Sequence, residues 1–234
     1  MKRAILNYSG SVGKTVVATH LLKPRMPNAK FFAVESINQS ASDLGVADVE
    51  TLQGRAVGEL IEQLVLEDEA IIDIGASNIE SFFEAASRFH GAIDDFDSFI
   101  IPVTSEQKAW QESLKTVEAL AAIGVPADKI ILLPNRIEND PVSEIPGIFN
   151  YCKKTKKATV SADAFLYESE IYGYLAHHKL SFDALIDESI DYRALAKAET
   201  DPDKAKEYAR MYRWTKYAIP VRKNLDDCYS ALVR

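Results

Sequence analysis

Short runs of consecutive hydrophobic residues alternate along the chain with longer segments in which every third or fourth residue is hydrophobic. Continuous hydrophobic runs are typical of strands that helices cover on both faces of a sheet. They predict strands over residues 4–7, 30–34, 70–74, 98–103 and 130–133, with a sixth over 158–160. The segments with helical spacing predict helices over residues 14–22, 56–66, 79–90, 106–123 and 141–153.

This alternation predicts an α/β fold with a mainly parallel, twisted sheet and helices on both faces. After about residue 162 the strand pattern ends, and helices are expected over residues 164–178, 189–199, 203–217 and 221–233. Pro202 and Pro220 should break this helical region, because proline cannot donate a hydrogen bond inside a helix. Since no low-complexity linker intervenes, residues 163–234 are expected to pack as a helical extension on residues 1–162.

Composition narrows the class of protein. The chain has 234 residues, of which 47% are hydrophobic and 26% charged, as is ordinary for a globular protein. Cys152 and Cys228 lack the spacing of metal ligands, and no hydrophobic run approaches the length of a membrane span. We therefore expect a cytoplasmic protein. The formal net charge is −8, but residues 204–234 carry eight lysines and arginines against three acids, which favours an anionic partner there.

A glycine-containing segment, Tyr8-Ser9-Gly10-Ser11-Val12-Gly13-Lys14-Thr15, joins the first predicted strand to the first predicted helix. A strand, a glycine-rich turn and Lys-Thr at a helix start form the layout of a P-loop. We expect nucleotide phosphates to be bound by the residues Gly10, Ser11, Val12, Gly13, Lys14 and Thr15. Lys14 would contact the β- and γ-phosphates, and the Thr15 hydroxyl would bind Mg²⁺. The alternative is a glycine-rich turn that binds no ligand.

A second nucleotide motif follows in the run Glu69-Ala70-Ile71-Ile72-Asp73, an apolar strand that ends in a carboxylate. A Walker B strand presents its acid to Mg²⁺ in this way. Given the P-loop upstream, Asp73 is the expected metal residue beside Thr15. Without that P-loop, an apolar strand ending in aspartate would more often have a structural role only.

Further segments follow in a fixed order: Val34-Glu35-Ser36-Ile37-Asn38-Gln39, Ile71-Ile72-Asp73-Ile74-Gly75, Ile100-Ile101-Pro102-Val103-Thr104 and Leu133-Pro134-Asn135-Arg136. With the P-loop, this order resembles the deviant-Walker P-loop ATPases of the ParA/MinD group, which segregate plasmids, chromosomes and cell-division sites. The resemblance covers roughly residues 1–160. Within the group, the chain most resembles the StbB proteins of conjugative plasmids, which are small stability or transfer ATPases.

The resemblance implies a P-loop nucleotide-binding core over residues 1–162, with ATP and Mg²⁺ as cofactors and a base contact from Asn135 and Arg136. It also implies partners, namely a DNA-binding adaptor protein encoded with it, plasmid DNA contacted directly or through that adaptor, and a second copy in a homodimer. Asn135-Arg136-Ile137-Glu138 also loosely matches the guanine-reading Asn-Lys-x-Asp. Glu138 would place its carboxylate about one methylene too far out, which favours ATP over GTP.

Two departures from the family pattern bear on hydrolysis. Ser9 stands where the family has its signature lysine, which reaches the partner subunit's phosphates across a dimer. Ile37 stands where the family has the carboxylate that orients the attacking water, a task isoleucine cannot perform. Glu35 is expected to substitute in part, with Lys14 as the other catalytic residue; alternatively, Glu35 is a surface acid at a strand end. We therefore expect weak or partner-dependent ATP hydrolysis.

The C-terminal helices offer two further surfaces. In the first, Lys206, Arg210 and Arg213 share one face, and the opposite face holds Tyr208, Met211, Tyr212 and Thr215. The basic face would suit DNA phosphates, and the alternative is a solvated face on a docked helix. The second is the hydrophobic stripe Val221, Leu225, Cys228 and Leu232. Its polar side mixes acids and bases, which suits docking on the core better than membrane binding.

Three functions remain open at this point. The first is an ATPase that positions or transfers plasmid DNA together with an adaptor. The second is a nucleotide switch or scaffold that binds ATP and Mg²⁺ with little turnover. The third is a P-loop phosphotransferase or ligase that acts on a small molecule. Ser9 and Ile37 favour the second function over a fast version of the first.

Overall fold

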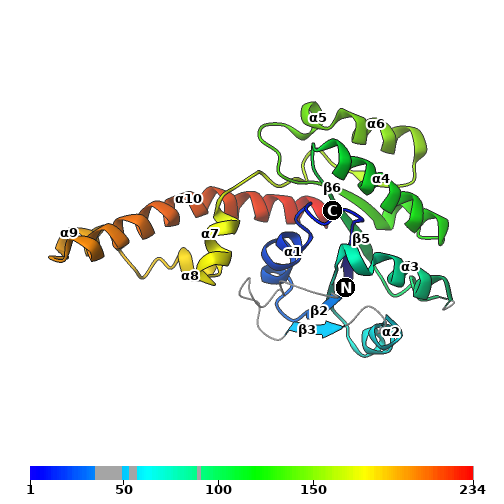
Figure 1. Cartoon of the computed structure of the whole chain (residues 1–234), viewed down its shortest axis with the longest axis horizontal. Coiled ribbons are helices and arrows are strands. Elements are labelled where there is room, and N and C mark those ends of the chain that lie inside the picture. The colour runs from blue at the N-terminus through cyan, green and yellow to red at the C-terminus, as the bar shows by residue number, and fades with distance from the viewer. Residues whose placement is uncertain (35–48, 53–56, 89–90, 234) are drawn as a thin grey trace.

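The structure is a computed structural model that describes residues 1–34, 49–52, 57–88 and 91–233. Its centre is a sheet of seven strands in the order β3-β2-β4-β1-β5-β6-β7, with every neighbouring pair parallel (Figure 1). The strands are β1 Lys2–Ile5, β2 Lys30–Val34, β3 Val49–Leu52, β4 Ala70–Ile74, β5 Ser98–Val103, β6 Ile130–Pro134 and β7 Thr159–Val160.

Helices connect these strands and form the C-terminal part of the chain. The first is α1 Lys14–Val16, which continues as the π-helical segment Val17–Leu22 and the 3₁₀ turn Lys23–Arg25. The others are α2 Val57–Leu66, α3 Ile79–Arg88, α4 Gln107–Ala122, α5 Pro141–Glu144, α6 Pro146–Thr155, α7 Ile171–His178, α8 Phe182–Leu185, α9 Tyr192–Ala198 and α10 Pro202–Leu232. Short 3₁₀ turns at Ala76–Asn78 and Ala127–Lys129 precede α3 and β6.

The sheet is buried on both faces because alternate side chains enter two separate hydrophobic clusters. Ala4 and Leu6 belong to the cluster under α2, α3, α4 and α6, whereas Ile5 belongs to the cluster under α1, α7, α8 and α10. Successive strand residues point to opposite faces, so a strand covered on both sides needs a continuous hydrophobic run. The predicted α/β fold, with a parallel sheet and helices on both faces, is confirmed.

Most strand predictions agree with the structure. The strands predicted over residues 30–34, 70–74 and 98–103 have these bounds, and the first strand lies two residues earlier than predicted. Strand β3 was not predicted. It is an edge strand in which only Leu52 is buried, so its sequence carries little of the hydrophobic signal that marks the inner strands.

The predicted break at Pro220 is wrong, because α10 runs through this proline without interruption. A proline inside a helix costs about 3 kcal/mol. Ala218 and Val221, on either side of it, both pack into the hydrophobic cluster under α10, while Pro220 itself is exposed. Docking on both sides of the proline therefore outweighs the local cost of carrying it.

Two other helices differ from prediction. The helix predicted over residues 164–178 begins only at Ile171, and the segment before it is extended, with Tyr167 bridged to Ile137. The helix predicted over residues 141–153 is divided into α5 and α6 at Ile145, whose non-helical backbone, with φ −127° and ψ 50°, precedes Pro146. A residue before proline is disfavoured in the helical conformation, which accounts for this division.

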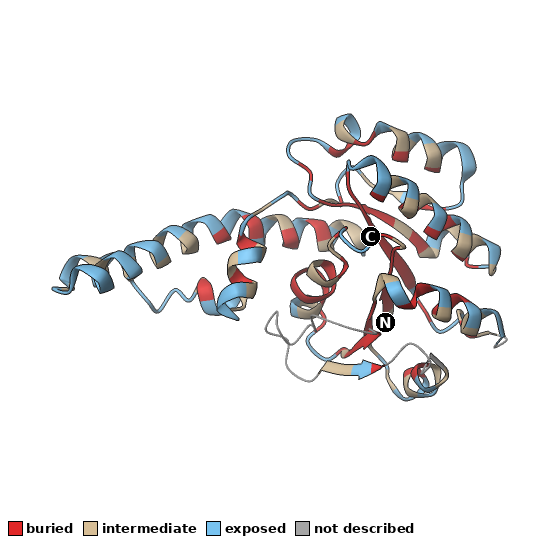
Figure 2. Ribbon diagram, viewed as in Figure 1, coloured by how far each residue is buried: buried red, intermediate tan, exposed pale blue. Residues whose placement is uncertain are grey.

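Burial along α10 changes near its middle (Figure 2). The inner part buries Val221, Leu225 and Cys228 against the sheet and the helix that begins at α1, and Leu232 is half-buried beside them. The predicted docking of this stripe on the core is therefore confirmed. The outer part of α10, with α9 packed along it, extends away from the sheet and is mostly exposed (Figures 1 and 2). Within the described ranges, no helix combines the length and hydrophobicity needed to cross a membrane.

Candidate functional site

The P-loop starts at the carboxyl end of β1, the central strand of the sheet between β4 and β5. The loop enters its helix through Gly13, whose φ of 84° and ψ of 31° lie in the left-handed region. A Cβ on Gly13 would also lie 2.5 Å from Nδ2 of Asn135. Both the conformation and the contact therefore require glycine at this position. Gly10 and Ser11, at the tip of the loop, are exposed.

Asn7 anchors the start of this loop, a role that the sequence analysis missed. Its buried Nδ2 donates to the Pro102 carbonyl at 2.8 Å and to the Ser113 hydroxyl at 2.7 Å. Its Oδ1 accepts from the Ser9 N–H at 2.8 Å. The amide thus ties the loop to β5 and to α4. The available sequence signal was a polar residue that ends an apolar strand directly before the glycines.

Tyr8 occupies the position where the strict P-loop pattern has glycine. Its N–H donates to the Thr116 hydroxyl at 3.1 Å, and its ring lies 6.0 Å from the ring of Phe83. Burial and the neighbouring Glu80 carboxylate raise the pKa of the Tyr8 hydroxyl to about 12. The side chain thus packs toward α3, away from the positions where glycine is needed, and the loop accommodates it.

Lys14 is buried at the start of the helix, and its Nζ donates to the carbonyls of Ser9 and Asn7 at 2.5 and 3.3 Å. The N-cap residue Gly13 has no side chain that could cap this helix. Backbone N–H groups and the helix dipole at such a terminus favour a bound anion. A loop of this shape at a helix start is suited to binding a phosphate.

Asp73 lies at the end of β4, in register with Ile5 of β1 and Ala33 of β2. The side chain is 2% exposed, and neither of its oxygens accepts a hydrogen bond of normal geometry from the described part of the chain. Burial raises the pKa of this carboxyl to about 6, opposed by the adjacent Thr15 hydroxyl and the positive charge of Lys14. The structure thus brings Lys14, Thr15 and Asp73 together.

This set of donors fits Mg²⁺. Hydroxyl and carboxylate oxygens are the ligands that Mg²⁺ prefers, and neither Asp73 oxygen accepts a hydrogen bond of normal geometry among the described residues. Over the same residues, no group of three or more His, Cys, Asp or Glu side chains could hold a metal ion. A cation here would therefore depend on phosphate oxygens and water, as is usual for Mg²⁺ in nucleotide sites.

Asn135 follows β6 and reaches the P-loop. Its Nδ2 donates to the Val12 carbonyl at 2.7 Å, and its Oδ1 accepts from the Arg136 N–H at 3.0 Å. Arg136 is exposed and has a positive φ of 56°. Asn135 therefore braces the P-loop in this structure, and the base contact expected from Asn135 and Arg136 stays a prediction.

Two of the residues that bear on hydrolysis, Glu35 and Ile37, lie outside the described residues. The strand that leads to them ends at Val34, whose carbonyl accepts from the Gly75 N–H at 2.9 Å and from Nδ2 of Asn78 at 3.1 Å. Ser9, at the position of the signature lysine, is buried and uses its backbone to bond Asn7 and Lys14.

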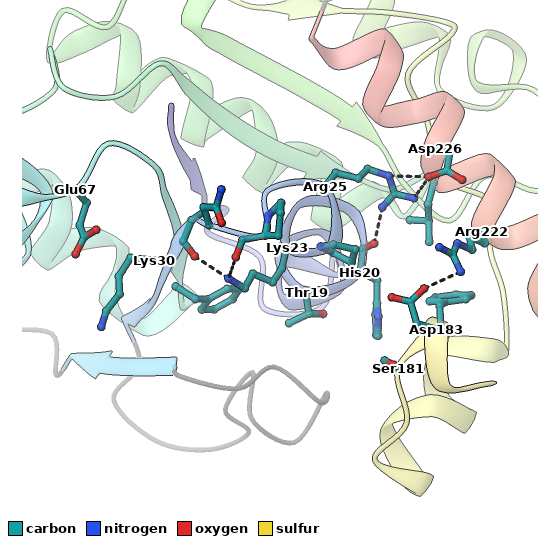
Figure 3. Close-up of a pocket in the computed structure, with 17 residues that line it drawn as sticks. Thr19, His20, Lys23, Arg25, Lys30, Glu67, Ser181, Asp183, Arg222 and Asp226 are labelled. Atoms are coloured by element: carbon teal, nitrogen blue, oxygen red, sulfur yellow. Dashed lines mark hydrogen bonds and ion pairs between the residues drawn. The ribbon is translucent and has the colours of Figure 1, made fainter. Parts of the chain in front are cut away.

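A cavity of about 720 Å³ lies near the far end of the helix that begins at the P-loop (Figure 3). Two ion pairs cross its wall, Arg25–Asp226 at 2.6 Å and Arg222–Asp183 at 2.7 Å. Lys30, which also lines the cavity, is the first residue of β2. It therefore lies at the amino ends of the strands, whereas the P-loop lies at their carboxyl ends. This cavity therefore cannot place a small molecule beside the P-loop, where a phosphotransferase would need its phosphate acceptor to bind.

Several solved structures share the fold. MinD from Aquifex aeolicus has a TM-score of 0.56 at 13% identity, covering 99% of this chain and 96% of that one. McdA from Cyanothece has a TM-score of 0.51 at 16% identity over 93% and 98%. A plasmid partition protein from Borrelia burgdorferi, bound to AMPPNP, has a TM-score of 0.51 at 14% identity over 91% and 97%.

These likenesses extend over nearly the whole chain, and at such identities they show the fold alone. The shared fold is an α/β fold with a seven-stranded parallel sheet and a helical C-terminal part, and it is similar to that of MinD from Aquifex aeolicus. The sequence matches no family model and no curated protein.

Proposed function

We propose that the protein binds ATP and Mg²⁺ at the P-loop and acts as a ParA/MinD-type ATPase in DNA positioning. The observation that carries this proposal is the pair of unpartnered Asp73 oxygens, buried beside Thr15 and Lys14 at the start of the P-loop helix. The resemblance of the sequence to StbB proteins supports a role in plasmid stability or conjugative transfer. The AMPPNP-bound plasmid partition protein of similar fold supports nucleotide binding.

Each residue has a separate role in this proposal. Thr15 and Asp73 would hold Mg²⁺, which supplies charge neutralisation on the phosphate oxygens when bound. Lys14 turns from the Ser9 and Asn7 carbonyls to the phosphates. Asn135 holds the loop in shape through Val12. With Arg136, it also contacts the base.

Hydrolysis is proposed to be weak unless a partner assists it. Ser9 carries no amine that could reach a second subunit, and Ile37 cannot orient water. Glu35 then has to orient the water, alone or with help from a partner. The partners proposed are an adaptor protein that binds DNA, plasmid DNA itself, and a second copy of the chain.

A nucleotide switch with little turnover is the second candidate function, and Ser9 is the observation that favours it. A serine that is buried and tied to its own loop leaves the usual cross-subunit contact unmade. ATP and Mg²⁺ would then set the conformation of a scaffold, without repeated hydrolysis.

The first experiment compares the wild-type protein with Lys14→Ala and Asp73→Asn in ATP titrations and phosphate-release assays, with and without Mg²⁺ and duplex DNA. We expect Lys14→Ala to weaken ATP binding about 100-fold or more, since a buried charge-assisted contact to phosphate is lost. Asp73→Asn should keep ATP binding and lose most of its Mg²⁺ dependence.

Lys115→Ala, which removes an exposed lysine from α4, is the matched control and should bind as the wild type does. Release stimulated by DNA supports the ATPase, and tight binding without release supports the switch. Absence of ATP binding by the folded wild-type protein would contradict both functions.

A further inference from the structure

Five aromatic rings form a continuous strip where α7 packs against the outer part of α10 (Figure 1). Tyr174, His177 and His178 belong to α7, and Trp214 and Tyr217 belong to α10. Successive ring centroids lie 4.9, 4.4, 4.3 and 5.7 Å apart, from His177 through His178, Tyr174 and Trp214 to Tyr217. We call these five residues the aromatic strip.

The two central rings of the aromatic strip are half-buried, whereas the rings at its two ends are exposed. Tyr174 and Trp214 are half-buried and stack with 21° between their planes, and the Tyr174 hydroxyl donates to Sδ of Met211 at 3.1 Å. His177 and His178 are exposed at one end, and Tyr217 is 41% exposed at the other. Exposed rings held by a stacked pair keep their orientation, which lowers the entropy cost of stacking a ligand on them.

Positive charge lies next to these rings. The guanidinium of Arg213 is 5.0 Å from the centroid of the Trp214 ring. Burial raises the pKa of the Tyr174 hydroxyl, while the positive charges of Arg210 and Arg213 act in the opposite direction. Both arginines are exposed. The negative charge of Glu207 opposes them and raises the pKa of the same hydroxyl. The strip is thus a cationic surface on a chain whose net charge is −8.

We infer that the aromatic strip binds single-stranded nucleic acid. Unpaired bases stack on exposed aromatic side chains, and arginines beside those rings contact the phosphates. In a duplex the bases are stacked inside the double helix. Its phosphates can contact the arginines, but its bases cannot stack on the aromatic rings. Positive charge beside the exposed rings attracts an anion, and charge complementarity therefore favours a ligand that carries both negative charges and flat aromatic groups, as a single-stranded nucleic acid does.

The outer part of α10 extends away from the P-loop core (Figure 1). Binding of single-stranded nucleic acid there therefore does not require a working nucleotide site. The inference is therefore independent of the proposed function. It also gives the exposed face of Lys206, Arg210 and Arg213 a more specific ligand than the duplex phosphates expected from the sequence.

The test is fluorescence anisotropy of a labelled oligothymidylate of about 20 nucleotides, longer than usual single-strand site sizes, against a duplex of equal length. We expect the single strand to bind more tightly than the duplex. Tyr217→Ala should weaken it about tenfold, within the range measured for loss of one stacked base. Arg213→Gln should weaken binding and reduce its salt dependence.

Two matched controls separate stacking and charge from general surface effects. Tyr167→Ala removes a tyrosine of similar exposure, 39%, and Arg88→Gln removes an exposed arginine of α3. Neither should change binding. In a Trp110→Phe background, Trp214 is the remaining tryptophan of the chain, and its fluorescence should be quenched by the oligothymidylate.

Equal binding of duplex and single strand, equal effects of Tyr217→Ala and Tyr167→Ala, or no binding at all would each overturn the inference. The Lys14→Ala variant keeps this test apart from the proposed function. It should lose ATP and still bind the single strand, so either proposal can fail while the other stands.

Discussion

Asn7 and Asn135 show how two amides shape the P-loop from outside it. Asn7 fixes the start of the loop to β5 and α4, and Asn135 bonds the Val12 carbonyl near its end. A buried amide that uses both its donor and its acceptor is costly to replace, because each lost partner leaves a buried polar group unpaired. The loop is therefore held in shape by Asn135 and by the two partners of Asn7, all of which are far from the loop in sequence.

His20 is the residue at which burial has the clearest consequence for pH. It is 4% exposed, lies between the rings of Tyr172 and Phe182 at 5.6 and 5.5 Å, and its Nε2 has no partner among the described residues. Burial lowers the pKa of this imidazole from 6.5 to about 4. The folded protein therefore binds fewer protons at His20 than the unfolded chain does between these two values.

Stability should consequently fall as the pH drops from about 6.5 to about 4, and the gap between the two pKa values corresponds to about 3 kcal/mol. His20→Phe keeps an aromatic ring and removes this proton linkage. We expect the free energy of unfolding of the wild type, relative to His20→Phe, to decrease over that range by up to this amount. Urea titrations of both proteins at several pH values measure it, and a constant difference would contradict the prediction.

Some residues of the candidate site can be predicted from local sequence motifs, and others only from contacts between distant parts of the chain. Gly13, Lys14, Thr15 and Asp73 could be predicted because the P-loop and the strand that ends in Asp73 are local patterns with a fixed chemistry. Asn7 could not, because its partners Pro102 and Ser113 lie about a hundred residues away. A long-range hydrogen bond leaves no periodic trace in the sequence.

At the scale of helices and strands, the packing of α10 on the core outweighs the local tendency of Pro220 to interrupt the helix. Its hydrophobic spacing continues across Pro220, from Ala218 to Val221, Leu225 and Cys228 at intervals of three and four residues. That periodicity is present in the sequence, but the local rule that proline interrupts a helix predicts a break there. The inner strands were predicted well for the opposite reason, because local propensity and burial there favour the same structure.

Pro220→Ala should therefore stabilise the protein. Alanine restores the missing backbone N–H and removes the ring from the helix interior, and we expect the free energy of unfolding to rise by about 1–3 kcal/mol. The neighbouring Ile219→Ala, which truncates a side chain that is 46% exposed, should change it little. Thermal and urea unfolding followed by circular dichroism provide the measurement, and destabilisation by Pro220→Ala would show that α10 depends on the proline.

At the scale of the whole molecule, α2, α3, α4 and α6 cover one face of the sheet, and the C-terminal helices together with the helix that begins at α1 cover the other. Ile5, Ile71 and Ile100 of three strands share a hydrophobic cluster with Leu175 and Leu225 of the C-terminal part. The sequence predicted that both faces are covered, from its continuous hydrophobic runs. Which helices cover which face depends on chain crossings that a hydrophobic pattern does not encode.

This arrangement leads to the proposal that residues 163–234 and residues 1–162 unfold together. The two tryptophans report on the two parts separately, since Trp110 lies in α4 and Trp214 in the outer part of α10. We expect the single-tryptophan variants Trp110→Phe and Trp214→Phe to give the same urea midpoint by fluorescence as by circular dichroism, as a two-state protein does.

Leu225→Ala extends this test, because Leu225 is 1% exposed at the contact between α10 and the core. Truncating it should cost about 2–5 kcal/mol and move the signals of both tryptophans together. Leu60→Ala, a fully buried residue of α2 in the cluster on the other face, should move both in the same way. If Leu225→Ala shifted only the Trp214 signal, the C-terminal helices would be a separate cooperative unit, and the outer part of α10 would be free to unfold while the P-loop core stays intact.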